Sequence, residues 1–76
     1  SVPDPEKSEI ELAKEFRAAA KVKGAPLNVI YFEGYLYMSL LAHAMQQLEE
    51  PYSKEKIINL FQNMKEYDFK GLKLNF

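Results

Sequence analysis

The stretch that decides the fold is Tyr31-Phe32-Glu33-Gly34-Tyr35-Leu36-Tyr37, because it opens the longest helical pattern in the chain. From Phe32 onward, apolar residues recur at spacings of three and four, which is typical of an amphipathic helix. The recurring set is Leu36, Tyr37, Leu40, Leu41, Ala44, Met45 and Leu48. Since a proline disfavours helical backbone in the residue before it, we expect this helix to span Phe32 to Glu50 and to end at Pro51.

Upstream of this helix, the chain predicts an extended connection and a first helix. Residues 28–31 contain Val29, Ile30 and Tyr31, which favour β structure, so we expect this short segment to be extended. The first helix is indicated by the apolar spacing of Leu12, Ala13, Phe16, Ala19 and Ala20. It is expected to end near Lys23, because Gly24 suits a left-handed position and Pro26 hinders continuation.

The start of the first helix has two alternatives in the sequence. Asp4 can cap a helix that begins at Pro5, since proline fits the first helical position. Ser8 and Glu11 can instead form a capping box, which places the start near residue 9.

Downstream of Pro51, the sequence predicts a third helix and a C-terminal strand. Ser53 is a suitable cap, and the helix is expected to bury Ile57, Ile58, Phe61 and Met64 and to end near Lys65. After the Lys70-Gly71 turn, Leu72, Leu74 and Phe76 alternate with polar residues, which is typical of a half-buried strand. Its partner in this chain is expected to be residues 29–31 or residues 67–69, and this scarcity of partners hints at further sequence.

Composition limits the classes of function. The 76 residues form a single segment with room for one small core, and their net charge of -1 gives no electrostatic basis for binding nucleic acid. Cysteine is absent, which excludes disulfides and thiolate metal sites. The longest apolar stretch falls short of a bilayer span. Because the first residues lack the features of a signal peptide, any export signal is expected upstream or already removed.

Four stretches, taken in order, resemble the C-terminal part of the periplasmic binding proteins of the leucine/isoleucine/valine-binding type. They are Val2-Pro3-Asp4-Pro5, Tyr31-Phe32-Glu33-Gly34-Tyr35, Tyr52-Ser53-Lys54-Glu55-Lys56, and the tail from Tyr67 to Phe76. The order and spacing carry the resemblance, since each stretch alone is common. One departure is Lys70, where the family often has a second glycine, so the turn before Leu72 is expected to be tighter or differently shaped.

The resemblance implies a fold, a partner set and a location. The expected fold class is mainly α in this chain, with three helices and a short C-terminal strand, as a fragment of a two-lobed α/β solute-binding domain. The implied function is capture of an amino acid or similar small solute, which is passed to the membrane permease of an ABC-type importer at the periplasmic or extracellular face. The same fold also serves as a ligand-sensing domain in signalling proteins, an alternative that the sequence leaves open.

Three residues are the candidate ligand-binding set, namely Tyr31, Phe32 and Glu33. The aromatic side chains could line a ligand pocket or, at helical spacing, belong to the core. Glu33 could face the solute cleft, or its carboxylate could simply be favoured by the helix dipole in a first turn. His43 is interpreted as a residue at the edge of the core. We expect no catalytic residue, no metal site and no cofactor.

A second hypothesis is an independent helical module that docks through exposed apolar helix faces on a partner or on a second copy. The fragment hypothesis predicts that upstream sequence is required for a monomeric, cooperative fold, whereas the module hypothesis predicts that these residues suffice. From the unpaired strand Leu72 to Phe76 and the apolar faces of the three helices, we expect the isolated chain to self-associate.

Overall fold

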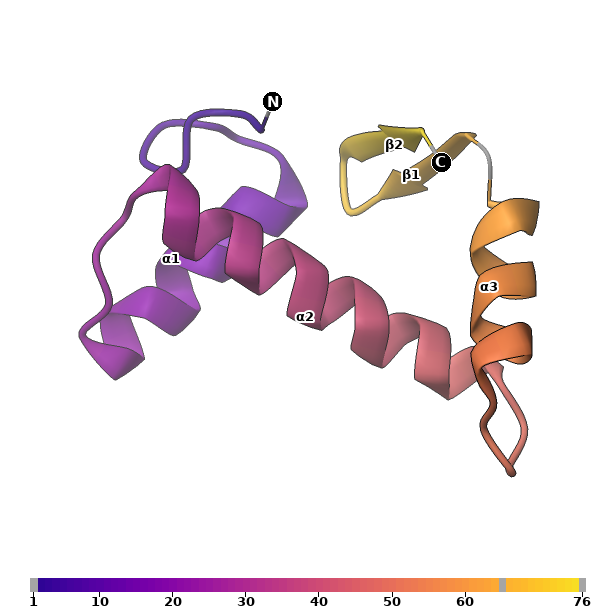
Figure 1. Ribbon diagram of the computed structural model, residues 1–76. Helices are drawn as coiled ribbons and strands as arrows, with labels where there is room; N and C mark the ends of the chain where they lie inside the picture. Colours follow the sequence, from indigo (N-terminus) through magenta and orange to yellow (C-terminus); the bar gives the residue numbers. More distant parts are fainter. Residues whose placement is uncertain (1, 65, 76) are drawn as a thin grey trace.

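The computed structural model describes residues 2–64 and 66–75 and shows three helices followed by a β-hairpin (Figure 1). The helices are α1 (Glu11–Lys23), α2 (Val29–Gln47) and α3 (Lys54–Asn63), and the strands are β1 (Glu66–Phe69) and β2 (Leu72–Asn75). The long α2 runs through the middle of the molecule, with α1 beside its first half and α3 at its far end. The mainly helical fold class is confirmed, and the single predicted strand is a two-stranded antiparallel sheet.

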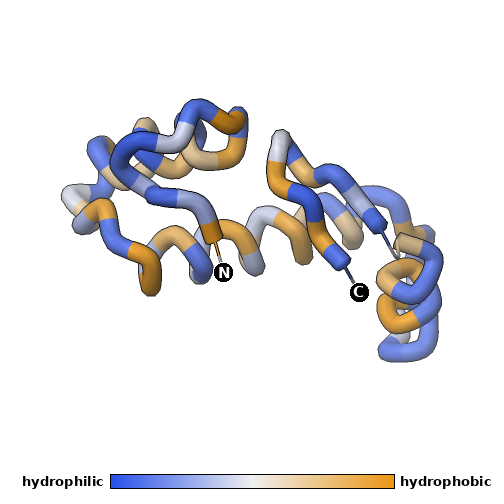
Figure 2. Tube along the Cα trace, turned by 90° about the horizontal axis from the view of Figure 1, so that it is seen from above, coloured by the Kyte–Doolittle hydropathy of each residue, from blue (hydrophilic) through white to orange (hydrophobic). Residues whose placement is uncertain are grey.

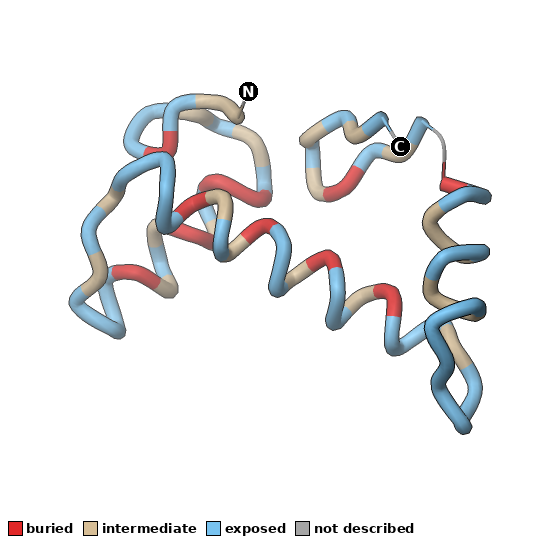
Figure 3. The backbone as a smooth tube through the Cα atoms, viewed as in Figure 1, coloured by how far each residue is buried: buried red, intermediate tan, exposed pale blue. Residues whose placement is uncertain are grey.

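The core lies where α1, α2 and the hairpin meet (Figure 3). Its buried members are Leu12, Ala13, Phe16, Ala20, Phe32, Leu36, Leu40, Met64 and Phe69. On α2 the buried residues Phe32, Leu36, Leu40 and Ala44 are spaced by four, so one narrow stripe of this helix faces inward. The burial of Leu12, Ala13, Phe16 and Ala20 on α1 and of Leu36, Leu40 and Ala44 on α2 is confirmed. Ala19 is only half-buried, and Leu48 is half-buried just past the end of α2. Tyr37, Leu41 and Met45 are exposed, contrary to the predicted stripe.

The expectation that residues 28–31 are extended is confirmed for Asn28 and wrong for residues 29–31, because α2 begins at Val29. Asn28 is the cap, and its side-chain Oδ1 accepts a hydrogen bond of 2.9 Å from the backbone N–H of Tyr31. This bond satisfies one of the free donors of the first turn and outweighs the β preference of the next three residues. At the other end α2 stops at Gln47, three residues before the predicted end.

The hairpin resolves the question of the strand's partner. Tyr67 pairs with Leu74 and Phe69 pairs with Leu72, so residues 67–69 are the partner and the alternative of residues 29–31 is wrong. Lys70 and Gly71 form the two-residue loop with φ values of 52° and 90°. Positive φ at both central positions is the requirement of a type I′ turn, which matches the twist of the paired strands. The predicted end of the strand at Phe76 lies outside the described residues.

The third helix differs from its prediction in burial and in length. Ser53 caps it as expected, since its Oγ accepts a hydrogen bond of 3.1 Å from the backbone N–H of Lys56. Of the predicted stripe only Met64 is buried, because α3 meets the rest of the chain only at the end of α2 and beside the hairpin. Ile58 is exposed, while Ile57 and Phe61 are half-buried. The predicted end at Lys65 lies outside the described residues; α3 ends at Asn63.

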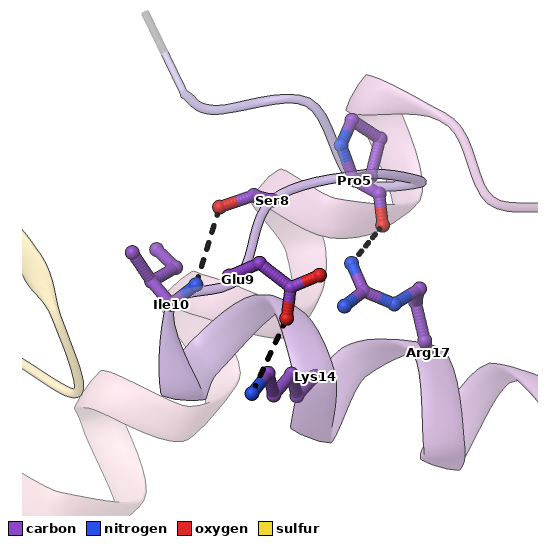
Figure 4. Close-up of polar contacts among 6 residues, drawn as sticks. All are labelled: Pro5, Ser8, Glu9, Ile10, Lys14 and Arg17. Atoms are coloured by element: carbon purple, nitrogen blue, oxygen red, sulfur yellow. Dashed lines mark hydrogen bonds and ion pairs between the residues drawn. The ribbon is translucent and has the colours of Figure 1, made fainter.

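Both predicted starts of α1 are wrong, since the helix begins at Glu11. Asp4 accepts a hydrogen bond of 2.8 Å from the N–H of Glu6, which closes a local turn, and Ser8 accepts one of 3.4 Å from the N–H of Ile10. Arg17 fixes the turn by donating to the Pro5 carbonyl at 3.1 Å, and Lys14 pairs with Glu9 (Figure 4). Each cap candidate therefore forms a turn ahead of the helix.

The start of α1 is capped by the hairpin. Ile10 occupies the cap position without a side-chain hydrogen bond, and the N–H of Leu12 donates instead to the backbone carbonyl of Lys70 at 2.9 Å. The ammonium of the same lysine binds both carboxylate oxygens of Glu15, at 3.0 and 2.7 Å. One turn residue thus satisfies a free donor of the helix and forms an ion pair one turn further along.

This ion pair gives a pH-dependent contribution to stability. The hydrogen bond to Glu15 raises the pKa of Lys70 above its ordinary value of 10.5. Because the folded pKa is the higher one, the contribution is complete below the unfolded pKa and is lost as the pH rises through the folded pKa. Both side chains are 35% exposed, so the pair is worth at most about 1 kcal/mol.

We expect the Lys70→Met variant to be less stable than the natural chain at about pH 8, and this difference to shrink above pH ~11. Urea unfolding at the two pH values measures it. A difference that stays constant with pH contradicts the assigned role of the ion pair.

Candidate functional site

The three candidate ligand residues occupy different faces of α2, because successive helical residues are about 100° apart. Tyr31 is half exposed, Glu33 is half-buried, and Phe32 is completely buried with its ring centroid 5.1 Å from that of Phe16. A solute could reach Phe32 only if this core opened. Their role as a ligand-binding set stays a prediction, with Tyr31 the most accessible member.

Glu33 lies one turn inside α2 and not in its first turn as expected, since the helix begins at Val29. The dipole of a helix acts mainly on its first turn. The helix dipole therefore explains the presence of a carboxylate at position 33 less well than the sequence suggested.

A groove between α1 and the first half of α2 is the main concave apolar feature near these residues. It has a volume of about 400 Å³ and is lined almost entirely by apolar atoms. The α2 side contributes Ile30, Tyr31, Gly34, Tyr35 and Met38, and the α1 side contributes Phe16, Ala19, Ala20 and Lys23. Ala25, in the connection between the two helices, also lines the groove. We call this feature the α1–α2 groove.

Small residues make the groove. Ala19 and Ala20 on α1 keep the side-chain layer thin, and Gly34 on α2 has no side chain at all. Tyr35 forms one wall, its ring 5.7 Å from that of Phe16 in the core. Of the described residues that line the groove, only Lys23 carries a full charge. The groove is therefore suited to binding an apolar group and offers little acid or base chemistry.

Gly34 has no packing reason to be glycine. A Cβ added there meets no atom within 4 Å, and the residue lies inside α2 with ordinary helical backbone. Glycine in a helix interior costs about 1 kcal/mol relative to alanine. Because Gly34 has no side chain, it leaves space at the groove, where another backbone or an apolar group could approach closely.

We therefore expect Gly34→Ala to stabilise the folded chain by about 0.5 to 1 kcal/mol. Urea unfolding followed by circular dichroism at low protein concentration measures the change. The matched control is Ser39→Ala, which lies in the same helix outside the groove and should gain less, because serine is a better helix former than glycine. A destabilised Gly34→Ala variant would show that the position is crowded in the folded chain.

A polar contact joins α2 to the hairpin at His43. Its Nε2 lies 2.7 Å from the hydroxyl of Tyr67 and 2.8 Å from the amide nitrogen of Gln47. The imidazole also packs against the ring of Phe69, with 5.5 Å between centroids. His43 is half-buried at the edge of the core, as expected, and it holds β1 on α2.

A second concave region lies along the hairpin, over residues Glu66–Asp68 and Lys73–Asn75, with a volume of about 440 Å³. Among the residues that the structure describes, its lining comes from the two strands of the hairpin. Among residues 2–64 and 66–75, no three His, Cys, Asp or Glu side chains are placed to hold a metal ion. None of the helices formed by these residues has both the length and the hydrophobicity of a membrane span.

The sequence analysis did not identify Ile30, Met38 or the α1 residues of the groove as parts of an exposed apolar surface. A usable signal was present: no Asp, Glu, Lys or Arg occurs between Glu33 and Glu49. A helix without charges over this length has more apolar surface than one core can cover. Figure 2 shows hydrophobic segments recurring along this helix.

Comparison with known proteins gives this chain no relatives: no protein-family model, no curated protein and no solved structure matches it.

Proposed function

We propose that this chain is the C-terminal segment of an extracytoplasmic solute receptor with two α/β lobes, which binds an amino acid or similar small solute and presents it to an ABC-type permease. The observation that carries the proposal is the ordered set of four stretches that resembles such receptors. Ligand contacts that stabilise a closed form of two lobes are the physical basis of this kind of capture.

Two features of the structure support the proposal. Each of the four stretches occupies a distinct place: the turn before α1, the first half of α2, the start of α3, and the hairpin. The chain also leaves large apolar side chains uncovered on α2, from Ile30 at 79% exposed to Met45 at 37%. Apolar surface on this scale is typical of a segment that packs on further protein.

The test begins with the intact mass of the natural gene product, compared with the 8.8 kDa of this chain. We expect a heavier product that binds one of the twenty amino acids in a calorimetric titration. In that product Tyr31→Ala should weaken binding at least about tenfold. Tyr52→Ala, a similarly exposed tyrosine outside the groove, is the control and should leave the affinity unchanged.

A natural product of 8.8 kDa that binds none of the amino acids overturns the proposal. It favours the second candidate function, an independent helical interaction module. The observation behind that candidate is the second apolar face of α2, which the chain's own core leaves exposed.

A further inference from the structure

The helix α2 has two apolar faces, and only one of them is buried. The inner stripe of residues spaced by four faces the core. The second face is formed by Ile30, Tyr31, Tyr37, Met38, Leu41 and Met45 around Gly34, all exposed. At about 100° per residue these positions cluster on the side of the helix away from the inner stripe. We call this surface the outer face of α2.

The spacing of the outer face is self-complementary. When two copies of α2 lie antiparallel about a two-fold axis between residues 37 and 38, Ile30 meets the partner's Met45 and Gly34 meets the partner's Leu41. Tyr37 then meets the partner's Met38 beside the axis. The absent side chain of Gly34 thus lies opposite a large residue, and a thioether lies against an aromatic ring, both favourable in helix packing.

We propose that the outer face of α2 is a homodimer interface, in which two copies of this chain pack antiparallel through α2 in this register. A two-fold arrangement of this kind is closed, because each copy binds through the same patch and none of these patches remains free to bind a third copy. The inference concerns the surface of the 76-residue chain. It competes with the proposed receptor for this surface, because further protein in a longer receptor would cover the same face.

The exposed area is sufficient for a stable dimer. The six side chains are between 37% and 79% exposed. Since a large apolar side chain offers roughly 200 Å² when free, they present about 700 Å² on each copy. This is close to the ~800 Å² per partner of a standard interface and above the largest apolar patch of ordinary monomers, about 300 to 600 Å².

The charges favour a second copy over a lipid surface or a charged peptide. No Asp, Glu, Lys or Arg lies between Glu33 and Glu49, so two outer faces meet without repulsion across the axis. Helices that bind lipid surfaces carry Lys or Arg along the polar side, and α2 has neither. A charged peptide would find no complementary group on this face.

The experiment is sedimentation equilibrium of the chain from about 1 to 200 µM, since interfaces of this size give Kd values in the micromolar range or tighter. We expect a mass of twice 8.8 kDa at the upper end. Met38→Glu places like charges next to the axis and should raise Kd at least about tenfold. Val22→Glu changes an apolar residue on α1 that is even more exposed than Met38, and this matched control should dimerise like the natural chain. Circular dichroism checks that both variants keep their helices.

Cysteine cross-linking tests the register, because the chain has no native cysteine. A mixture of Gly34→Cys and Leu41→Cys chains should oxidise mainly to the mixed disulfide, since these positions face each other only in the antiparallel register. A chain that stays monomeric at 200 µM overturns the proposal, as does equal weakening by Met38→Glu and Val22→Glu. Preferential cross-linking of Gly34→Cys to itself, or a longer natural product that is monomeric with this face protected from hydrogen exchange, also overturns it.

Discussion

Replacing Phe32 with alanine is expected to unfold the chain. Phe32 has no exposed surface, packs on the ring of Phe16 and is one of the two largest completely buried side chains. Removing a buried phenylalanine side chain costs about 3 to 5 kcal/mol through lost burial and the cavity left behind. A core in a chain of this size supplies rarely more than about 3 to 5 kcal/mol of net stability.

The measurement is thermal unfolding followed by far-ultraviolet circular dichroism. The neighbouring Tyr31→Ala is the matched control, because its side chain is 51% exposed and should contribute much less. We expect Tyr31→Ala to keep a cooperative transition and Phe32→Ala to show none. A Phe32→Ala protein that melts cooperatively within a few degrees of the natural chain would show that the α1–α2 packing is not the main source of stability.

Replacing Gly71 with alanine is expected to detach the hairpin from α1. Gly71 has a φ of 90°, and a Cβ there would lie 2.9 Å from the Cβ of Ile10, which is closer than two carbon atoms can approach. The backbone strain of about 1 to 3 kcal/mol adds to a similar cost of overpacking. We expect a total loss of about 2 to 4 kcal/mol, and with it the capping of α1 by the Lys70 carbonyl.

Two matched comparisons separate these causes in urea unfolding experiments. Gly24→Ala has a φ of 70° with nothing within 4 Å of the added Cβ, so it should lose only the strain, about 1 kcal/mol. In an Ile10→Gly background the overlap is removed, and Gly71→Ala should cost about as much as Gly24→Ala. If Gly71→Ala costs the same with and without Ile10, the hairpin does not rest on the start of α1.

The sequence predicted the elements of the fold better than their limits. Patterns that depend on neighbours in the chain were reliable: the end of α1 at Gly24, the Ser53 cap, and the turn at Lys70 and Gly71 all form as expected. The prediction for residues 29–31 failed because one hydrogen bond, donated by the Tyr31 N–H to the Asn28 side chain, decided between two conformations of similar propensity. The start of α1 failed because its cap comes from a residue far away in the sequence.

The candidate site shows the same division between local and distant causes. The sequence singled out residues 31–33, and the structure separates them into one groove residue, one core residue and one half-buried carboxylate. Periodicity alone could not tell which apolar stripe of α2 faces inward, because the helix is apolar on two sides. Contacts with Phe16 on α1 and Phe69 on β1 decide it.

The sequence by itself determined the number of helices, which is three, and the end of the first helix. It also determined that a turn suited to a hairpin follows the third helix. These features arise from interactions between residues that are close in the sequence, and such residues stay close in space whether or not the chain is folded. Only the tertiary structure decided where α1 begins, which face of α2 is buried and which is left open. Those outcomes depend on the hydrogen bond from the Leu12 N–H to the Lys70 carbonyl and on the buried cluster that contains Phe16, Phe32 and Phe69. Such contacts exist only when distant segments are packed together.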